Sequence, residues 1–262
     1  MLARQPFDSS GLRRLRAAAA GTNSPDMYSQ SSKYYDALYG ALGKDYDAES
    51  TRIARIASER CRSGGNALLD VACGTGKHIE KLRGHFACEG LDVSRSMIEI
   101  AQERNPDVTF HLGDMIGFNL GKRFDVILCM FGAIAYAPNV QRLEQTLQTF
   151  ARHLKPGGVI IVEPWVRPED WKDGAVHALF VDEPDLKVAR MSVSRRDANV
   201  SVLHFHYMVA SRDGIRTFTE PHRLTLFSAD EYRNAFRKAG LFVEFEDDGG
   251  RGLYVGFSRA ES

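Results

Sequence analysis

A short apolar segment that runs into a glycine turn constrains the fold of this chain more than any other feature. Residues 67–71 are apolar apart from Asp70 and indicate a strand, and Cys73-Gly74-Thr75-Gly76 follows almost directly. Glycine lets the backbone adopt a positive φ and approach a ligand that a residue with a Cβ would not clear. The third glycine of the dinucleotide fingerprint is missing, because Lys77-His78 follow the turn, so the pattern does not predict a pyrophosphate cradle here.

Strands and helices alternate around this turn at a regular spacing. Strands are expected at residues 67–71, 88–93, 108–112, 124–131 and 159–162, and helices at residues 47–62, 76–86, 95–104 and 140–154. The fourth strand is almost wholly apolar, as a central parallel strand should be. This alternation predicts an α/β fold with a doubly wound, mostly parallel seven-strand sheet and right-handed crossovers.

The alternation changes after Glu163-Pro164. Residues 176–227 show a period of two, with turn residues at 197–199 and 213–214, which predicts three or four antiparallel strands inserted after the fifth strand, within residues 165–227. Ser228-Ala229-Asp230-Glu231 has the form of a capping box and predicts a last helix. Residues 241–245 and 253–257 are then expected to close the sheet as an antiparallel pair.

Composition excludes several classes of protein. The 262 residues include 34 Lys and Arg and 34 Asp and Glu, so the formal net charge is zero, which gives no electrostatic reason to expect nucleic acid or a membrane as partner. No apolar run is long enough for a transmembrane helix, and with no export signal we expect a cytoplasmic protein. The four cysteines form no Cys-x-x-Cys pair and are expected to be reduced thiols packed in the core.

The N-terminal segment stands apart from the rest. Residues 1–26 are basic and poor in acidic residues, a bias that organellar transit peptides share. We expect a disordered extension here and a single folded domain over residues 27–262.

Motifs along the folded part resemble a known family. The glycine turn is similar to the S-adenosylmethionine (SAM) site of the seven-strand, Rossmann-like methyltransferases. The most specific further pieces, Glu163-Pro164-Trp165 and Gly250-Arg251-Gly252-Leu253, resemble the N-methyltransferases that act on TDP-linked amino sugars in antibiotic biosynthesis. The resemblance implies SAM as cofactor, S-adenosylhomocysteine as product, and one or two methyl transfers to the amine of a small molecule. It also implies an insertion that covers the active site, and, together with the free edges of that insertion, a homodimer.

The expected cofactor site begins with three carboxylates. Asp92 ends the second strand, where it can accept both ribose hydroxyls; a cap beside Ser94 is the alternative. Asp114 follows the third strand and suits the adenine amino group, or is a plain loop residue. Asp70 is expected to organise the turn or to receive the methionine ammonium, because a buried carboxylate needs a partner. The full expected cofactor-binding set is Asp70, Ala72, Gly74, Gly76, Asp92, Val93, Met97, Asp114, Met115 and Met130.

The acceptor site follows from the resemblance. It places Tyr39 beside the amine and the reacting methyl group, and Tyr136 at a position where the family carries histidine or tyrosine; pure packing is the alternative for both. Arg251 is expected to bind the pyrophosphate with its guanidinium fork, the alternative being an ordinary ion pair. Tyr46, Trp165, Arg167 and Arg251 form the expected substrate-binding set.

Departures from the family leave the acceptor open. Gly132-Ala133 replaces a Ser-Ser pair, and Val166-Arg167 replaces Trp-Phe. The alternatives are therefore another small-molecule nitrogen or oxygen acceptor, or a SAM-binding protein without activity. The hypothesis of an amino-sugar N-methyltransferase predicts in-line displacement at the methyl group of SAM by the amine, with no single indispensable base. We expect no metal, since His204 and His206 share a strand face without a third ligand nearby.

Overall fold

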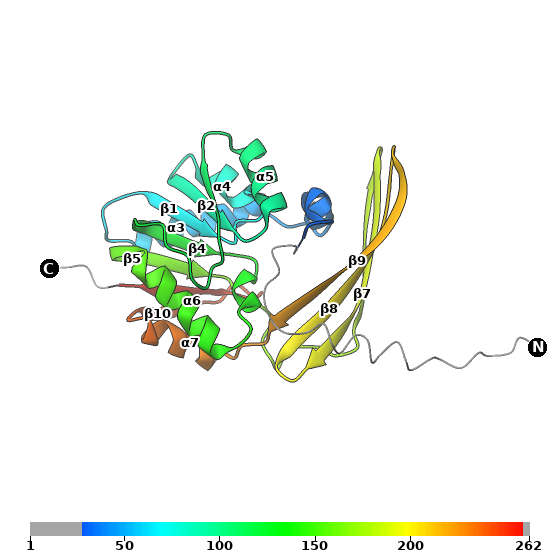
Figure 1. Cartoon of the computed structure of the whole chain (residues 1–262). Coiled ribbons are helices and arrows are strands. Elements are labelled where there is room, and N and C mark those ends of the chain that lie inside the picture. Colours follow the sequence, from blue (N-terminus) through cyan, green and yellow to red (C-terminus); the bar gives the residue numbers. More distant parts are fainter. Residues whose placement is uncertain (1–27, 259–262) are drawn as a thin grey trace, which may run out of the picture.

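The structure is a computed structural model that describes residues 28–258 (Figure 1). The expected extension over residues 1–26 lies outside the described residues. The first half of the described chain contains η2 Ser32–Tyr34, α2 Tyr35–Ala41, α3 Tyr46–Arg60, β1 Ala67–Val71, α4 Lys77–Leu82, β2 Ala87–Asp92, α5 Arg95–Arg104, β3 Thr109–Leu112, β4 Phe124–Cys129, η3 Ala133–Tyr136, α6 Val140–Arg152 and β5 Leu154–Val162. The second half contains β6 Val176–Glu183, β7 Leu186–Asp197, β8 Val200–Ser211, β9 Gly214–Thr225, α7 Ala229–Lys238, β10 Phe242–Glu246 and β11 Leu253–Phe257.

A seven-stranded sheet forms the centre of the fold, in the order β10-β11-β5-β4-β1-β2-β3. Strands β1 to β5 pair in parallel, while β11 pairs antiparallel with both β5 and β10. The order reverses at β1, whose neighbours are β2 and β4, and ligands of open α/β sheets bind beyond the carboxyl ends of the strands at such a point. The predicted doubly wound sheet with a closing antiparallel pair is confirmed.

Helices cover both faces of this sheet because its central strands are apolar on both sides. On one face Leu68 and Ile161 pack with Ile53 and Ile56 of α3. On the other face the adjacent residues of the same strands pack against α6 and α7. Figure 1 shows α3, α4 and α5 on one side of the sheet and α6 and α7 on the other. Burial of successive side chains on opposite faces is what a two-sided parallel sheet requires.

The predicted insertion is a separate four-stranded antiparallel sheet in the order β6-β7-β8-β9. It projects beyond the ends of the main sheet (Figure 1). Its inner face packs on the N-terminal helices, where Leu38 of α2 meets Leu179, Val188 and Tyr207. The hydroxyl of Thr225 donates to the carbonyl of Ala137 at 2.7 Å, which fixes the end of β9 against the segment that follows β4.

The structure differs from two local predictions, the turn at residues 155–158 and the cap at Ser94. Residues 155–158 are not a turn before the fifth strand but part of β5, which begins at Leu154 and pairs there with Phe124. A register irregularity before Val126 accommodates the additional residues. Ser94 occupies the N-cap position of α5, but its hydroxyl makes no capping bond. The Ser228 capping box of α7 is confirmed, with both reciprocal bonds present.

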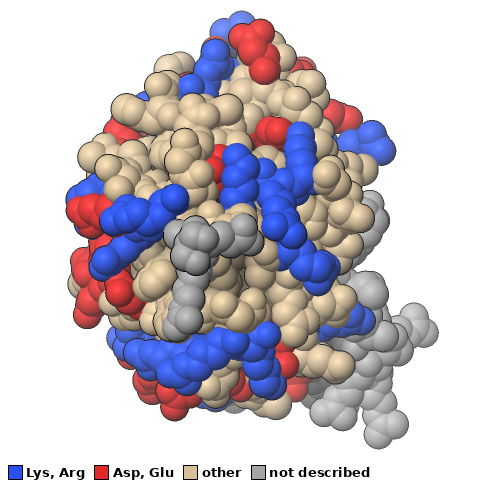
Figure 2. All heavy atoms as spheres, turned by 90° about the vertical axis from the view of Figure 1, so that its left-hand side faces the viewer, with Lys and Arg blue, Asp and Glu red and all other residues tan. Residues whose placement is uncertain are grey.

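The surface charge is mixed. On the face turned away from the insertion, bands of Lys and Arg lie beside Asp and Glu (Figure 2). Cations pair with neighbouring acids, as Arg60 does with Glu244 at 2.6 Å and Lys122 with Glu89 at 2.6 Å. Within residues 28–258 no helix is both long and apolar enough to cross a membrane.

Candidate active site

A cavity of about 560 Å³ lies where the carboxyl ends of the parallel strands face the inner surface of the insertion. Of the ten expected cofactor-binding residues, eight line it: Ala72, Gly74, Asp92, Val93, Met97, Asp114, Met115 and Met130. Tyr39, Tyr136, Trp165 and Arg251 line the same cavity. The remaining four expected site residues, Asp70, Gly76, Tyr46 and Arg167, do not. The structure therefore brings eight of the ten expected cofactor residues, both expected catalytic tyrosines and two of the four expected substrate residues into one continuous space.

The glycine turn forms one wall of the cavity. Gly74 has φ +54° and no atom within 4 Å of where a Cβ would stand, so the backbone lies open to the cavity there. Ala72 also has a positive φ, of 58°, which is uncommon outside glycine and costs free energy. Gly76 serves packing instead, because a Cβ on it would lie 2.9 Å from Asn105 Nδ2 and 3.1 Å from Ala101 Cβ.

Asp92 joins the turn to the end of the second strand. Its Oδ2 accepts the N–H of Gly74 at 2.8 Å, and its Oδ1 accepts the N–H of Ser94 at 2.8 Å. Burial raises the pKa of Asp92 above its ordinary value, although these N–H groups act in the opposite direction. The N–H of Val93 also bonds this carboxylate, which has about four acceptor sites in all, so that capacity for a further donor remains. The capping alternative and a ligand-binding role are therefore compatible in this geometry.

Asp70 lies beneath the turn. Its Oδ2 is buried and has no hydrogen-bond partner, and burial raises the pKa of Asp70 to about 6. A buried carboxylate without a partner is costly. An orphaned acceptor under a glycine turn suits a ligand that brings a cationic or N–H group to the turn, as the ammonium of a bound amino acid would.

Helix α2 lies over the glycine turn and is anchored there by one carboxylate. Asp36 accepts the hydroxyl proton of Thr75 at 2.7 Å and forms an ion pair with Arg104 of α5. This anchor orients the aromatic residues of α2 toward the cavity. Tyr39 packs edge-on against Phe131 with a ring-centroid separation of 4.7 Å, and its hydroxyl accepts a bond of 3.5 Å from Arg190.

Three polar groups form a chain in the cavity wall. The hydroxyl of Tyr136 lies 2.9 Å from the hydroxyl of Tyr28 and 2.7 Å from Nδ1 of His222. Burial raises the pKa of Tyr136 well above its usual range, so it is a neutral hydroxyl. Burial lowers the pKa of His222 to about 4, so the imidazole is neutral at physiological pH, and its Nε2 has no partner.

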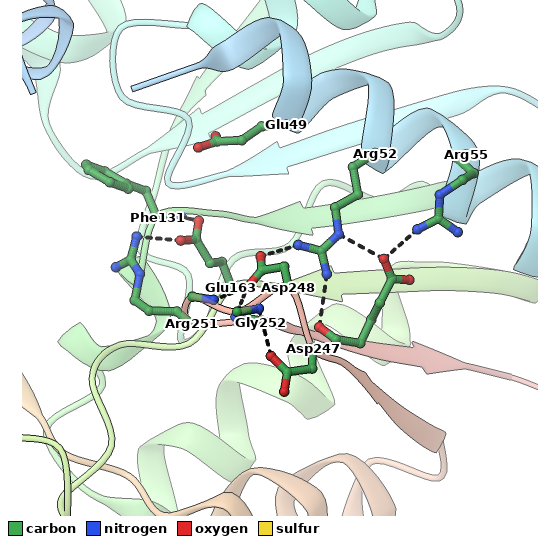
Figure 3. A network of polar contacts seen from close by, with 12 residues as sticks. Glu49, Arg52, Arg55, Phe131, Glu163, Asp247, Asp248, Arg251 and Gly252 are labelled. Atoms are coloured by element: carbon green, nitrogen blue, oxygen red, sulfur yellow. Dashed lines mark hydrogen bonds and ion pairs between the residues drawn. The ribbon is translucent and has the colours of Figure 1, made fainter. Parts of the chain in front are cut away.

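Arg251 is held by a network that reaches from β5 to α3 (Figure 3). Its guanidinium pairs with Glu163, whose other carboxylate oxygen accepts the N–H of Phe131 at 2.6 Å. The loop that carries Arg251 folds around Asp248, which accepts the N–H groups of Gly250 and Gly252 at 2.8 and 3.0 Å. The ion-pair alternative for Arg251 is thus present, and the paired side chain still lines the cavity.

Two expected substrate residues lie elsewhere. The ring of Tyr46 packs edge-on against His78, with centroids 5.0 Å apart. The guanidinium of Arg167 stacks over Phe245, 5.4 Å from the ring centroid. Both side chains are engaged outside the lining of the cavity.

Several cavity or support residues were not anticipated from the sequence: Asp36, Arg190 and His222. For Arg190 and His222 a usable signal existed, because alternation on β7 and β9 places them on the same faces as Val188 and Leu224, which are buried. For Asp36 no signal existed, since its partners Thr75 and Arg104 are 39 and 68 residues distant.

Comparison with known proteins finds methyltransferases as relatives of this chain. The family described as "Methyltransferase domain" matches residues 68–158. The chain is 40% identical over 249 residues to dTDP-3-amino-3,6-dideoxy-alpha-D-glucopyranose N,N-dimethyltransferase of Streptomyces fradiae, which covers 94% of this chain and 97% of the relative.

Two solved structures are similar along most of the chain. The crystal structure of DesVI from Streptomyces venezuelae has a TM-score of 0.82 and 41% identity, covering 88% of this chain and 99% of that one. The SAM-bound structure of CalS10, an amino pentose methyltransferase from Micromonospora echinaspora involved in calicheamicin biosynthesis, has a TM-score of 0.76 and 37% identity, covering 85% of this chain and 95% of that one.

Proposed function

Since the chain belongs to the family of SAM-dependent N,N-dimethyltransferases of dTDP-linked amino sugars, we propose that its substrate is such a sugar and that the methyl group goes to the sugar's amine. The family, the fold and SAM as cofactor are confirmed as predicted. The observation that carries the acceptor class is a continuous cavity that joins the glycine turn to an aromatic and cationic wall.

The residues of the cavity fit SAM by their chemistry. The open backbone at Gly74 suits an amino-acid portion. Asp70 does not line the cavity, but its buried, unpartnered carboxylate oxygen lies beneath the turn and favours a positive charge there. The carboxylate of Asp92, which lines the cavity, suits a ribose hydroxyl, and Asp114, on an exposed loop, suits an adenine amino group. Ala72, Val93, Met97, Met115 and Met130 supply the apolar surface. When bound, SAM supplies an electrophilic methyl group on a sulfonium that is already a good leaving group.

The contribution of the chain is then placement rather than acid–base chemistry. Tyr39 and Tyr136 are proposed to accept N–H bonds from the amine and so to leave its lone pair directed at the methyl group. Holding two reactants in line accounts for several kcal/mol of a barrier. Because Tyr136 is a neutral hydroxyl and His222 a neutral imidazole, neither is proposed to store the proton of the amine, which must be lost to solvent before attack.

The acceptor end is proposed to use Trp165 and Arg251. Trp165 donates its indole N–H to Ser201 at 3.0 Å, which fixes the ring, and the Arg251 guanidinium lies 5.5 Å from its centroid. A guanidinium on an aromatic face is suited to bind a diphosphate. Tyr46 and Arg167 are not part of this proposal, because they do not line the cavity.

The outer face of the insertion supports the proposed homodimer. Phe180 is 60% exposed and Met208 55% exposed, and both are opposite Ala189 in the sheet register. Large apolar side chains on one exposed face are typical of interaction sites. Light scattering of the purified chain tests the dimer, and a monomer at micromolar concentration would contradict it. Cytoplasmic location stays a prediction.

The test of the function is direct. The chain is incubated with SAM and a dTDP-linked amino sugar, and the product mass is measured for one or two added methyl groups. Binding of S-adenosylhomocysteine, measured by calorimetry, reports separately on the cofactor site. A folded chain that binds S-adenosylhomocysteine but methylates only other amines or hydroxyls would refute the acceptor class.

A further inference from the structure

The charges that line the cavity are separated by sign. Asp92 ends β2 and Asp114 follows β3, at one end of the main sheet. Arg190 of β7 and Arg251 of the β10–β11 loop are the guanidinium groups in the described lining, and β10 and β11 stand at the opposite end of the sheet. The cavity therefore has an acidic end near the glycine turn and a cationic end near the insertion.

The two arginines differ in how their charge is compensated. Arg251 pairs with the carboxylate of Glu163. Arg190 is half-buried between two rings, with its guanidinium 5.3 Å from the centroid of Tyr39 and 4.5 Å from that of Phe205. Over residues 28–258 no carboxylate lies within ion-pair distance of Arg190, in contrast to Arg251. A guanidinium is always charged, and a charge removed from water without a counter-ion costs free energy.

We propose that Arg190 binds the diphosphate of the acceptor. Its uncompensated positive charge adds to that of Arg251, which the ion pair with Glu163 partly neutralises. The inference rests on the proposed function, which makes the acceptor a dianion. The guanidinium donates to the hydroxyls of Tyr39 and Tyr207. Because it carries five N–H donors, others on its edge remain to bind phosphate oxygens. A position beside Tyr39 also places the anion next to the residue proposed to hold the amine.

The test compares variants of two arginines on the same strand. Arg190 shares the inner face of β7 with Ser192 and Ser194, both buried, whereas Arg195 is exposed on the outer face. The full-length chain, saturated with S-adenosylhomocysteine, is titrated with dTDP and separately with thymidine by calorimetry. Arg190→Met is expected to weaken dTDP binding by about ten- to one-hundred-fold, the range of one charge-assisted contact, and to leave thymidine and S-adenosylhomocysteine unchanged.

The controls separate charge from shape. Arg190→Lys keeps the charge and loses the fork, so it is expected to weaken dTDP binding less than Arg190→Met; it also serves if the methionine variant does not fold. Arg195→Met is expected to bind dTDP as the unmodified chain does.

Three outcomes would overturn the inference. Unchanged dTDP binding by both variants of Arg190 would do so, and so would equal weakening of dTDP and thymidine. A shift of the pH dependence of turnover with intact dTDP binding would assign Arg190 to the amine instead. If the unmodified chain binds S-adenosylhomocysteine but not dTDP, the proposed acceptor class fails as well, which distinguishes the two failures.

Discussion

Replacement of Arg52 by alanine should weaken acceptor binding from a position that does not line the cavity. Arg52 lies on α3 and donates from Nε to Glu246 Oε1 at 2.8 Å, from Nη2 to the Glu246 carbonyl at 2.9 Å, and to Asp248 (Figure 3). Asp248 in turn holds the loop around Arg251 through the N–H groups of Gly250 and Gly252. The substitution removes the outer support of this loop.

The magnitude follows from exposure. The side chain of Arg52 is 21% exposed, so its contacts are partly screened, and we expect a loss of about 1.5 kcal/mol in the free energy of unfolding rather than the sum of three full charge-assisted bonds. Because the loop loses its fixed position, the KM for the dTDP-linked amino sugar should rise by about ten-fold. Affinity for S-adenosylhomocysteine should not change, since its expected residues lie on other elements.

Arg55 offers a matched control one turn along the same helix. Its side chain is 47% exposed and pairs with Glu59 and Glu246, but it makes no contact with Asp248 among the interactions of the described chain. Arg55→Ala should leave KM and stability nearly unchanged. Urea unfolding, steady-state kinetics and calorimetry measure these quantities. An unchanged acceptor KM in Arg52→Ala, or an equal loss of S-adenosylhomocysteine affinity, would refute the reasoning.

Three further predictions concern the cavity and the buried carboxylate beneath the glycine turn. Tyr39→Phe and Tyr136→Phe should each lower kcat by about 10- to 100-fold without abolishing turnover, and a folded but inactive Tyr39→Phe chain would contradict the placement mechanism. His222→Asn should keep a hydrogen-bonding partner for Tyr136 and retain most of kcat, whereas His222→Leu should lose about ten-fold; equal losses in the two variants would argue against a role through Tyr136. The pKa of Asp70 is raised to about 6 in the folded chain, so the folded chain binds this proton more tightly than the unfolded chain, and the free energy of unfolding falls as the pH rises from about 4 to about 6. Asp70→Asn should remove on the order of 3 kcal/mol of that fall, measured by urea unfolding at the two pH values. An unchanged pH dependence in this variant would refute the assignment.

The sequence was sufficient for features that are local or periodic. The glycine turn, the capping box at Ser228 and the alternation over residues 176–227 each depend on neighbouring residues, and each formed as expected. The start of β5 was wrong because Lys155 to Gly158 carry a turn-like sequence, while Leu154 before them and Val159 after them both pair with β4, so that the strand runs across an irregularity. Tertiary pairing overrides local preference in sheets.

Contacts between distant segments could not be derived from the sequence. The bond between Tyr136 and His222 joins residues 86 positions apart, and that between Arg52 and Glu246 joins residues 194 positions apart. Tyr46 and Arg167 were assigned to the substrate by motif alone, and the structure places them away from the cavity lining. A motif fixes which residue types are present, but the packing of other elements decides whether they reach the ligand.

The cavity is enclosed by parts of the chain with separate sources of stability. The turn after β1 depends on the seven-stranded sheet, whereas much of the opposite wall depends on the β6–β9 sheet and its own small core with α2. The two parts meet through α2, whose Asp36 bonds Thr75 of the turn, and through Thr225 of β9, which bonds the carbonyl of Ala137. Exchange of the four-stranded unit for that of a relative would therefore alter the wall that carries Arg190 and His222, while the turn that carries Gly74 stays as it is.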